Sequence, residues 1–161
     1  MKIIVVSDSH SKPGVLENVV KTHPDAYAFL HCGDIEDYAS NYPEYLIVQG
    51  NNDIFYDHPM QRILTLGGHR ILMVHGHQFS PFRRLEEMAI AAKKENCDIV
   101  LYGHTHVAAD DEIDGVRLLN PGSLRYSRDG RPTSYIILTL DDAHIDVKFV
   151  FNEEKQSKFF W

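Results

Sequence analysis

The sequence has few positive charges for its size. Its 161 residues include 16 lysines and arginines against 23 aspartates and glutamates, so the formal net charge is -7 at pH 7. A surface of this charge does not favour broad electrostatic binding to nucleic acid or to an anionic membrane. Only a local positive site, such as one made by metal ions, would attract an anionic ligand. We therefore expect neither stable nucleic-acid binding nor membrane binding.

Paired cysteines and long apolar runs are also missing. Cys32 and Cys97 each lie beside a predicted strand and outside any Cys-x-x-Cys motif, so we expect both to be reduced and structural. The first apolar run, residues 3–6, is too short for the core of a secretory signal or for a membrane-spanning helix. The length is that of one domain. We expect a cytoplasmic protein with a single domain over residues 1–161.

One pattern occurs five times along the chain. A short apolar run is followed at once by a polar cluster that contains glycine, aspartate, asparagine or histidine. The runs cover residues 3–6, 27–30, 45–48, 71–74 and 98–102. Such runs are typical of strands buried on both faces. Helical spacing of apolar residues at 15–20 and 83–96 predicts helices between some of them. In such βαβ arrangements the carboxyl ends of the strands meet, so the polar clusters should converge.

The last third of the chain has a different pattern. Asp114-Gly115 lies between two extended runs in residues 112–119, which predicts a type I′ hairpin. Two further strands are predicted at 135–140 and 144–151, the second with one alternating apolar face. The sequence therefore predicts an α/β fold. A mixed sheet would carry the polar clusters, and a second, antiparallel-rich sheet would pack against it.

The polar clusters contain seven side chains of the kind that bind metal ions. They are Asp8, His10, Asp34, Asn51, His75, His104 and His106. Carboxylate, amide oxygen and imidazole nitrogen together suit manganese, iron, nickel or zinc. Seven ligands are too many for one such ion, so we expect two ions that share a carboxylate, with Asp34 as the candidate bridge. In an extended chain His104 and His106 would point to the same side and bind one ion each, with the ions about 3.5–4 Å apart.

The six other histidines divide into two groups. We expect four of them to be exposed to solvent: His23, His58, His69 and His144. The remaining two, His31 and His77, lie near the polar clusters, and their roles stay open.

The clusters resemble the motifs of the calcineurin-like metallophosphoesterases. The motifs are Asp8-x-His10, Gly33-Asp34-x-x-Asp37, Gly50-Asn51-x-Asp53, His75-Gly76-His77, Gly103-His104-x-His106 and the later Asn120-Pro121-Gly122-Ser123. The chain is similar to the compact, single-domain bacterial and archaeal branch of that family. The resemblance implies a four-layer α/β/β/α sandwich with a dinuclear site, in which manganese is the first choice of metal.

The resemblance also implies a role for each residue. One ion would be bound by Asp8, His10, Asp34 and His106. The other would be bound by Asp34, Asn51, His75 and His104. Asp37 and Asp53 would either orient the ligand loops or only cap their own loops. The segment 120–123 would be a tight turn that supports the ligand loops.

The implied activity is hydrolysis of a phosphate monoester or diester by a hydroxide that bridges the two ions. Many relatives have a histidine after the Gly-Asn pair, where this chain has Asn52. Asn52 can donate a hydrogen bond to a phosphoryl oxygen but cannot give up a proton at neutral pH. His77 or solvent would then supply the proton. Lys12 is a second candidate for substrate binding, although an ordinary surface lysine is the simpler interpretation.

Two other functions compete with that of a phosphoesterase. A protein-interaction scaffold on the same fold, like the retromer subunit that resembles these enzymes, would use its surface and lose part of its ligand set. A nuclease is disfavoured by the net charge of -7. The apolar tail 158–161 is expected to pack on the domain or on a second copy, so a homo-oligomer stays open.

Overall fold

Two five-stranded sheets form the centre of the computed structural model, which describes residues 1–152. The first sheet contains, in spatial order, β10 (Ile145–Phe151), β9 (Ser134–Leu140), β1 (Lys2–Val6), β2 (Ala28–His31) and β3 (Tyr45–Ile47). The second contains β4 (Gln61–Leu66), β5 (His69–Val74), β6 (Ile99–Leu101), β8 (Val116–Asn120) and β7 (Ala109–Ile113). The tail at 158–161, with its expected packing, lies outside the described residues.

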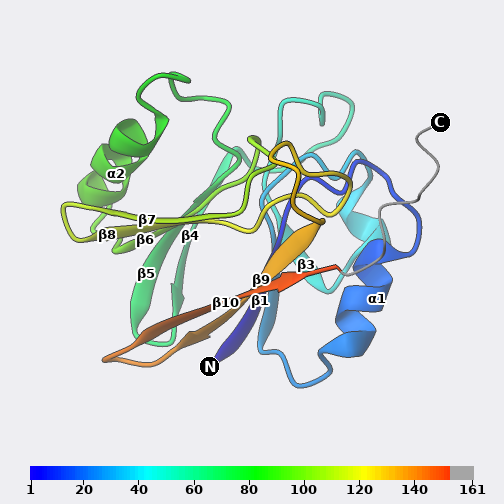
Figure 1. Ribbon diagram of the computed structural model, residues 1–161, viewed down its shortest axis with the longest axis horizontal. Coiled ribbons are helices and arrows are strands. Elements are labelled where there is room, and N and C mark those ends of the chain that lie inside the picture. Colours follow the sequence, from blue (N-terminus) through cyan, green and yellow to red (C-terminus); the bar gives the residue numbers. More distant parts are fainter. Residues whose placement is uncertain (153–161) are drawn as a thin grey trace.

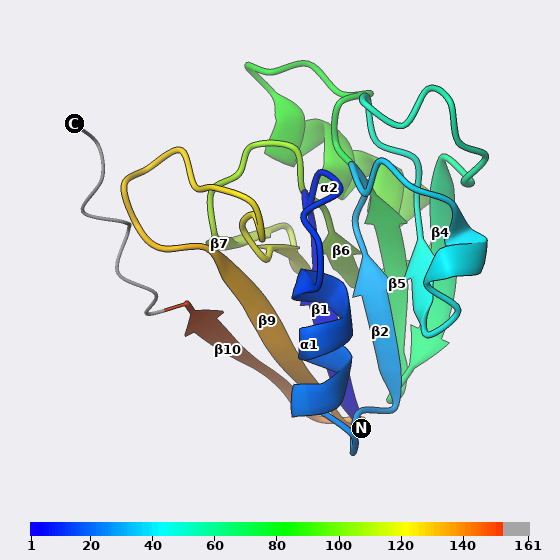
Figure 2. The same cartoon turned by 90° about the vertical axis from the view of Figure 1, so that its right-hand side faces the viewer.

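One α-helix covers the outer face of each sheet. Helix α1 (Val15–Thr22) packs Leu16 and Val19 on the first sheet, and α2 (Arg84–Lys94) packs Met88 on the second. Figures 1 and 2 show these layers, with α2 and α1 on opposite sides of the two sheets. The predicted α/β/β/α sandwich is confirmed. Within residues 1–152, no helix has both the length and the apolar character needed to cross a bilayer.

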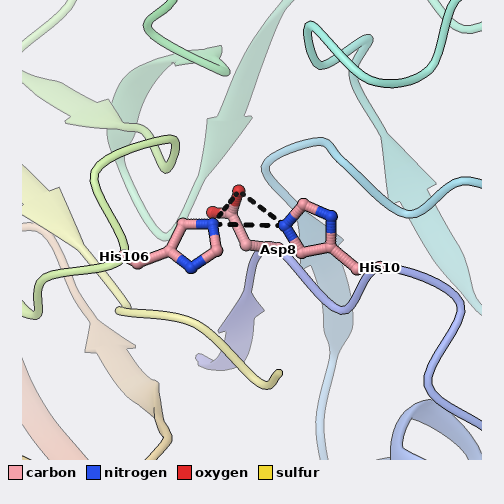
Figure 3. Close-up of side chains that lie close together, drawn as sticks. All are labelled: Asp8, His10 and His106. Atoms are coloured by element: carbon pink, nitrogen blue, oxygen red, sulfur yellow. Dashed lines mark hydrogen bonds and ion pairs between the residues drawn. The ribbon is translucent and has the colours of Figure 1, made fainter. Parts of the chain in front are cut away.

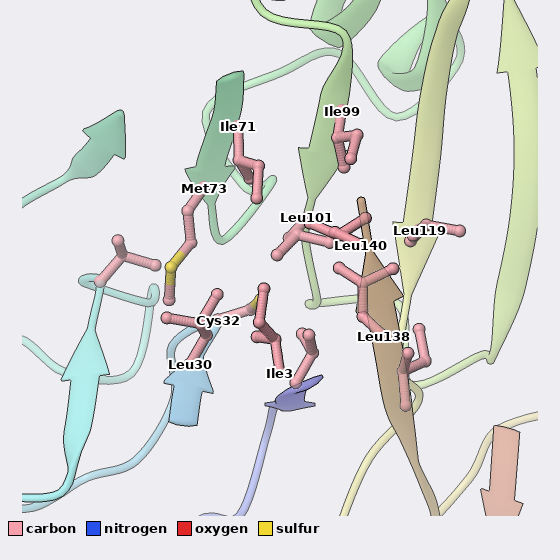
Figure 4. Close-up of a cluster of buried hydrophobic side chains, with 13 residues drawn as sticks. Ile3, Leu30, Cys32, Ile71, Met73, Ile99, Leu101, Leu119, Leu138 and Leu140 are labelled. Carbon is pink, nitrogen blue, oxygen red and sulfur yellow. The ribbon is translucent and has the colours of Figure 1, made fainter. Parts of the chain in front are cut away.

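The place of β1 between α1 and the second sheet explains why its residues 3–6 are all apolar. Ile3 and Val5 face the second sheet, whereas Ile4 and Val6 face α1. All four are fully buried. Figure 4 shows the cluster between the sheets, to which both sheets contribute side chains. Burying one such side chain contributes about 2 kcal/mol, so this apolar layer holds the two sheets against each other.

The division of strands between the sheets differs from the expectation. The hairpin β7–β8 joins the second sheet, with β8 parallel to β6. Strands β9 and β10 instead extend the first sheet, with β9 antiparallel to β1. Each sheet therefore has two parallel and two antiparallel pairings, and neither is antiparallel-rich. Alternating apolar residues indicate that a strand has one buried face, but they do not specify its neighbour.

Two hairpin turns have the backbone that their residues favour. Asp114 and Gly115 both have positive φ, at 50° and 81°, which agrees with the predicted type I′ turn. Gly67 and Gly68 also have positive φ and connect β4 to β5. The prediction omitted β4, although a Gly-Gly pair between two apolar runs is itself a hairpin signal.

Three histidines predicted to be exposed are buried. His23, His58 and His69 are each less than a tenth exposed, whereas His144 is exposed as expected. The prediction was wrong because each buried ring has a hydrogen-bond partner from a distant segment. The His23 ring, for example, lies 2.7 Å from the Tyr135 hydroxyl. A histidine with such a partner can be buried at little cost.

His69 connects the two sheets at the end where β5 begins. Its Nδ1 donates to the Asp98 carboxylate at 2.6 Å, and its Nε2 donates at 2.6 Å to the carbonyl of Asp141, which follows β9. Burial alone would lower the pKa of His69, but these two partners raise it overall. Both ring nitrogens donate only in the imidazolium form, so this contact is strongest when His69 is charged.

We predict that His69→Gln destabilises the protein more at pH 5.5 than at pH 8.5. The charged form contributes stability that is full below the unfolded pKa of about 6.5 and is lost as pH rises through the raised folded pKa. The expected loss at low pH is about 1 kcal/mol, measured by urea unfolding of metal-free protein. The exposed His144→Gln variant is the control. Equal losses at both pH values would contradict the prediction.

Candidate metal centre

All seven predicted ligands follow the carboxyl ends of strands. The oxygen donors come from the first sheet: Asp8 follows β1, Asp34 follows β2 and Asn51 follows β3. His10 also follows β1. The other imidazoles come from the second sheet, with His75 after β5 and His104 and His106 after β6. Both sheets thus supply the site, and the expectation that one sheet carries it was wrong.

A first group of donors contains Asp8, His10 and His106 (Figure 3). The Asp8 Oδ1 atom is buried and has no hydrogen-bond partner within residues 1–152. It lies 3.3 Å from His106 Nε2 and 3.8 Å from His10 Nε2, and these two nitrogens are 3.2 Å apart. A buried carboxylate oxygen without a partner is costly. A cation held between these three atoms would remove that cost.

A second group contains Asp34, Asn51, His75 and His104. The Asn51 Oδ1 atom lies 3.0 Å from both His75 Nε2 and His104 Nδ1. His75 Nε2 is also 3.4 Å from Asp34 Oδ2. This group therefore places two oxygens and two nitrogens around one point, a donor set suited to a first-row divalent ion.

The two carboxylates lie between the groups. Asp34 Oδ2 is 3.9 Å from His10 Nε2 in the first group and 3.4 Å from His75 Nε2 in the second. Asp8 Oδ1 is likewise 3.8 Å from His75 Nε2. Asp8 and Asp34 thus each approach both groups, and the geometry agrees with a shared carboxylate without distinguishing between them.

Three of the imidazoles are oriented by an acceptor on the side away from the site. Their Nδ1–H groups donate to a carboxylate or a backbone carbonyl, as histidine ligands of metals usually do. The pairs are His10 with Glu36 Oε1 at 2.9 Å, His75 with the Cys32 carbonyl at 2.6 Å and His106 with the Tyr126 carbonyl at 2.9 Å. In the neutral form of each ring, Nε2 then has no proton, faces the donor groups and can bind a cation.

The electrostatics of the site favour positive charge at its centre. Burial would raise the pKa of Asp8, but the neighbouring His106 and His75 lower it overall. Burial would also raise the pKa of Asp34, but His75 lowers it overall. Burial would lower the pKa of His75, but Asp34 and Asp8 raise it. Burial and the charge of His75 lower the pKa of His104 to about 4. The carboxylates are thus ionised and His104 is neutral at pH 7.

Backbone strain is concentrated at the predicted ligands. Nine residues other than glycine have positive φ within the described chain, and five of them are predicted ligands: Asp8, His10, Asp34, His104 and His106. Such conformations cost about 1–3 kcal/mol each and cluster at functional sites. His104 and His106 have φ of 73° and 60°, so the expectation of an extended chain between them was wrong. The turn directs His104 to the second group and His106 to the first.

Glycines allow the ligand loops to approach one another. A Cβ atom on Gly50 would collide with the carboxylate of Asp34, and one on Gly103 would collide with the Ser7 hydroxyl. A Cβ atom on Gly33 would come within 2.6 Å of His75 Nδ1. The loops could not approach this closely with a larger residue at any of these three positions.

Asp53 fixes two of the ligand loops, one of the two roles considered for it. It is fully buried, and its carboxylate accepts hydrogen bonds from the backbone N–H groups of Asp34 (2.8 Å), Glu36 (2.7 Å) and Gly50 (2.8 Å). Asp37 has the other role: it accepts a hydrogen bond from the amide of Asn41 in its own loop.

The segment 120–123 supports the ligand loops, as predicted. The Asn120 amide donates to the Gly103 carbonyl at 3.1 Å. The Ser123 hydroxyl donates to the Asp8 carbonyl at 2.8 Å. These contacts connect the loops after β1 and β6, which carry ligands from different sheets.

The residues predicted to contact substrate have different surroundings. The Asn52 side chain donates to Asp34 Oδ2 at 2.9 Å, so it also positions a predicted ligand. Lys12 is half-buried beside the first motif, and its ammonium makes no ion pair with residues 1–152. The His77 ring lies 5.4 Å from that of His75 and 6.3 Å from that of His104, so it borders the second group. Its Nδ1 is buried and has no hydrogen-bond partner in the same part of the chain.

His31, whose role was open, is structural. It is fully buried, its Nδ1 accepts from the Gly33 N–H at 3.0 Å, and its Nε2 donates to the Ser9 hydroxyl at 2.9 Å. Burial lowers the pKa of His31 to about 3, so the ring is neutral and connects the loops after β1 and β2.

A family model agrees with this geometry. The model for the calcineurin-like phosphoesterase superfamily domain matches residues 1–143. The chain belongs to this superfamily. Membership implies that the protein uses divalent metal ions, and the donor groups described above fit that requirement.

Individual relatives agree with this assignment. The calcineurin-like chain is 33% identical over 153 residues to the probable metallophosphoesterase YsnB of Bacillus subtilis, with 92% of this chain and 90% of that protein covered. A crystal structure of a predicted phosphoesterase from Streptococcus pneumoniae has a TM-score of 0.86 and 30% identity, over 93% of this chain and 88% of that one. A zinc-complexed Vps29 of Entamoeba histolytica shares the fold, with a TM-score of 0.73 and 24% identity over 94% and 99% of the two chains.

Two residues of the calcineurin-like site were not found from the sequence. Glu36 orients His10, and the main chain of Tyr126 orients His106. Glu36 lies inside the Gly33-to-Asp37 motif, and its nearness to Asp34 was an available signal. Tyr126 is 20 residues from His106, and nothing in its local sequence indicates this contact.

We predict that Asp53→Asn lowers the free energy of unfolding by about 2 kcal/mol. The substitution keeps the shape but removes the charge that accepts three backbone N–H groups. Urea unfolding of the two proteins measures the loss. Asp57→Asn, at an exposed position of the same loop, is the matched control and should change stability by less than about 0.5 kcal/mol. Similar losses in the two variants would show that Asp53 does not fix the loops.

Proposed function

We propose that the protein is a metal-dependent phosphoesterase that hydrolyses small phosphate monoesters or diesters at a site for two divalent ions. The observation that carries the proposal is the Asp8 Oδ1 atom, which has no hydrogen-bond partner among residues 1–152 and is buried between imidazole nitrogens of both donor groups. Manganese is the first metal to test, and iron, nickel and zinc suit the same donors. Membership of the superfamily supports a phosphate ester as substrate.

Each ion would take donors from both sheets. The first would be held by Asp8, His10, Asp34 and His106, and the second by Asp34, Asn51, His75 and His104. When bound, the two ions supply an activated water for attack on phosphorus and positive charge for the phosphoryl oxygens. Because their charge exceeds that of the two carboxylates, the site attracts an anionic ester in spite of the acidic protein around it.

The remaining groups position the reactants. Asn52 donates to Asp34 through both its backbone N–H and its amide, each at 2.9 Å, and so fixes the orientation of the shared carboxylate. Its second amide hydrogen is free to donate to a phosphoryl oxygen. His77 borders the Asn51 side of the site and is the candidate proton donor to the leaving group. Lys12 is the candidate for attracting the anionic ester from the Asp8 side.

A non-catalytic scaffold is the competing function, because Vps29 shares the fold. The predicted donor set argues against it, since all seven positions hold competent groups and face one another. A Vps29 crystal structure contains zinc, so bound metal alone does not separate the two functions. Turnover of a phosphate ester by the metal-loaded protein separates them.

We predict metal-dependent hydrolysis of p-nitrophenyl phosphate or its bis ester. EDTA should abolish the activity, and added manganese should restore it. Asp8→Asn should lower kcat by at least about 100-fold, because it removes a charged metal ligand. No turnover of either ester by protein loaded with manganese, iron, nickel or zinc would overturn the enzyme and favour the scaffold.

We also predict that Glu36 strengthens metal binding through His10. Its carboxylate makes the imidazole more basic and fixes its tautomer, so Glu36→Gln should weaken one of two manganese-binding steps by about tenfold. Isothermal titration of the metal-free protein measures both steps. Glu44→Gln, an exposed position with the same change of charge, should leave both unchanged. If the two variants weaken manganese binding equally, Glu36 acts only through the net charge of the protein and not through His10.

A further inference from the structure

The loop between β8 and β9 forms one wall of the candidate metal centre. The Tyr126 carbonyl accepts from His106 Nδ1 at 2.9 Å. Arg128 donates two hydrogen bonds in the opposite direction. Its backbone N–H donates to the His106 carbonyl at 3.2 Å, and its Nη1 donates to the His104 carbonyl at 3.3 Å. The two loops are thus held together at both predicted histidine ligands. The backbone of Tyr126 and the side chain of Arg128 are thereby held beside the site.

The ring of Tyr126 lies at the exposed rim of the first donor group. Its centroid is 4.5 Å from that of His106 and 6.3 Å from that of His10, and it is inclined by only 26° to the His10 ring. About half of the residue, 49%, is nevertheless exposed. An aromatic ring that is held by its neighbours and still half-exposed offers a preformed surface for a planar group.

The guanidinium of Arg128 lies over this ring, with its central carbon 5.9 Å from the ring centroid. Arg83, Arg117 and Arg131 each pair with a carboxylate. Arg128 is exposed and makes no such pair with any residue in the described part of the chain. An unpaired cation held against the ligand loop adds positive charge at the entrance to the proposed anion site.

We propose that Tyr126 and Arg128 form the subsite for the organic part of the substrate, and that this subsite selects phosphate esters with a planar aromatic group, such as a nucleoside. The proposal rests on the proposed function. A planar group beside the phosphorus would stack on the Tyr126 ring, as bases stack on aromatic side chains elsewhere. Arg128 would contact the oxygens of the ester and hold it against the ligand loop.

A second apolar surface, next to the loop that carries His104 and His106, provides a control for the proposed subsite. A cleft of about 450 Å³ is lined by Phe82, Leu85, Tyr102 and Thr105, among others. Phe82 is 96% exposed, but the lining includes none of the seven predicted ligands. Phe82 is therefore the matched control, an exposed aromatic residue outside the proposed subsite.

The test compares two ligands with the same phosphate group on manganese-loaded protein. Adenosine 5′-monophosphate carries a planar base, and glycerol 3-phosphate has no planar ring. Their affinities are measured by titration, at times too short for detectable hydrolysis. Hydrolysis is monitored in a parallel sample. The wild-type protein should bind the adenosine compound more tightly. Tyr126→Ala should weaken that binding by about tenfold and change binding of glycerol 3-phosphate by less than about twofold. Tyr126→Phe should keep the preference, and Phe82→Ala should leave both affinities unchanged.

The Arg128→Gln variant tests the contribution of charge apart from that of stacking on Tyr126. It should weaken the binding of both ligands to a similar degree, whereas Arg125→Gln, at a neighbouring exposed position, should not. The subsite is refuted if Tyr126→Ala leaves the preference for the adenosine compound intact, or if the wild-type protein binds both ligands equally. Failure of wild-type protein to bind manganese or either ligand would instead count against the proposed function, so the two failures are distinguishable.

Discussion

The structure depends on the burial of two carboxylates, Asp8 and Asp34, where the two sheets meet. Each is almost completely buried, and charged groups in such places need opposite charge or several hydrogen bonds. Asp34 accepts two hydrogen bonds from Asn52. Asp8 keeps one oxygen without any partner among residues 1–152. The surrounding imidazoles turn their Nε2 atoms toward that oxygen, and the arrangement of oxygens and nitrogens is complementary to cations.

The rest of the site follows from this requirement. Bringing loops from five strands around two carboxylates leaves no room for Cβ atoms at Gly50 and Gly103. It also forces ligand residues such as Asp8 and His104 into left-handed backbone conformations. Such conformations are unfavourable on their own. Support comes from Asp53, which accepts three backbone N–H groups, and from the turn at 120–123. Strain and support therefore occur together at the ligand loops.

The sequence predicted the central strands and the ligand set because both are local signals. An apolar run such as residues 3–6 specifies a buried strand, and the polar cluster after it can only lie at the end of that strand. Properties set by distant contacts were not predicted. The sheet that β9 and β10 join depends on pairing with β1, and the burial of His69 depends on Asp141, 72 residues away. The contact between Tyr126 and His106 is of the same kind.

The division of donors between the sheets has a further consequence. The first sheet supplies all the oxygens and one imidazole, and the second supplies only imidazoles, so neither sheet holds a complete cage for an ion. The spacing inside the cage is therefore fixed by the apolar layer of Figure 4, in which side chains such as Ile3 and Leu101 set how far apart the sheets stand. The ligand distances around an ion bound between the sheets would therefore depend on that spacing. A core substitution that adds or removes a methyl group would change these distances.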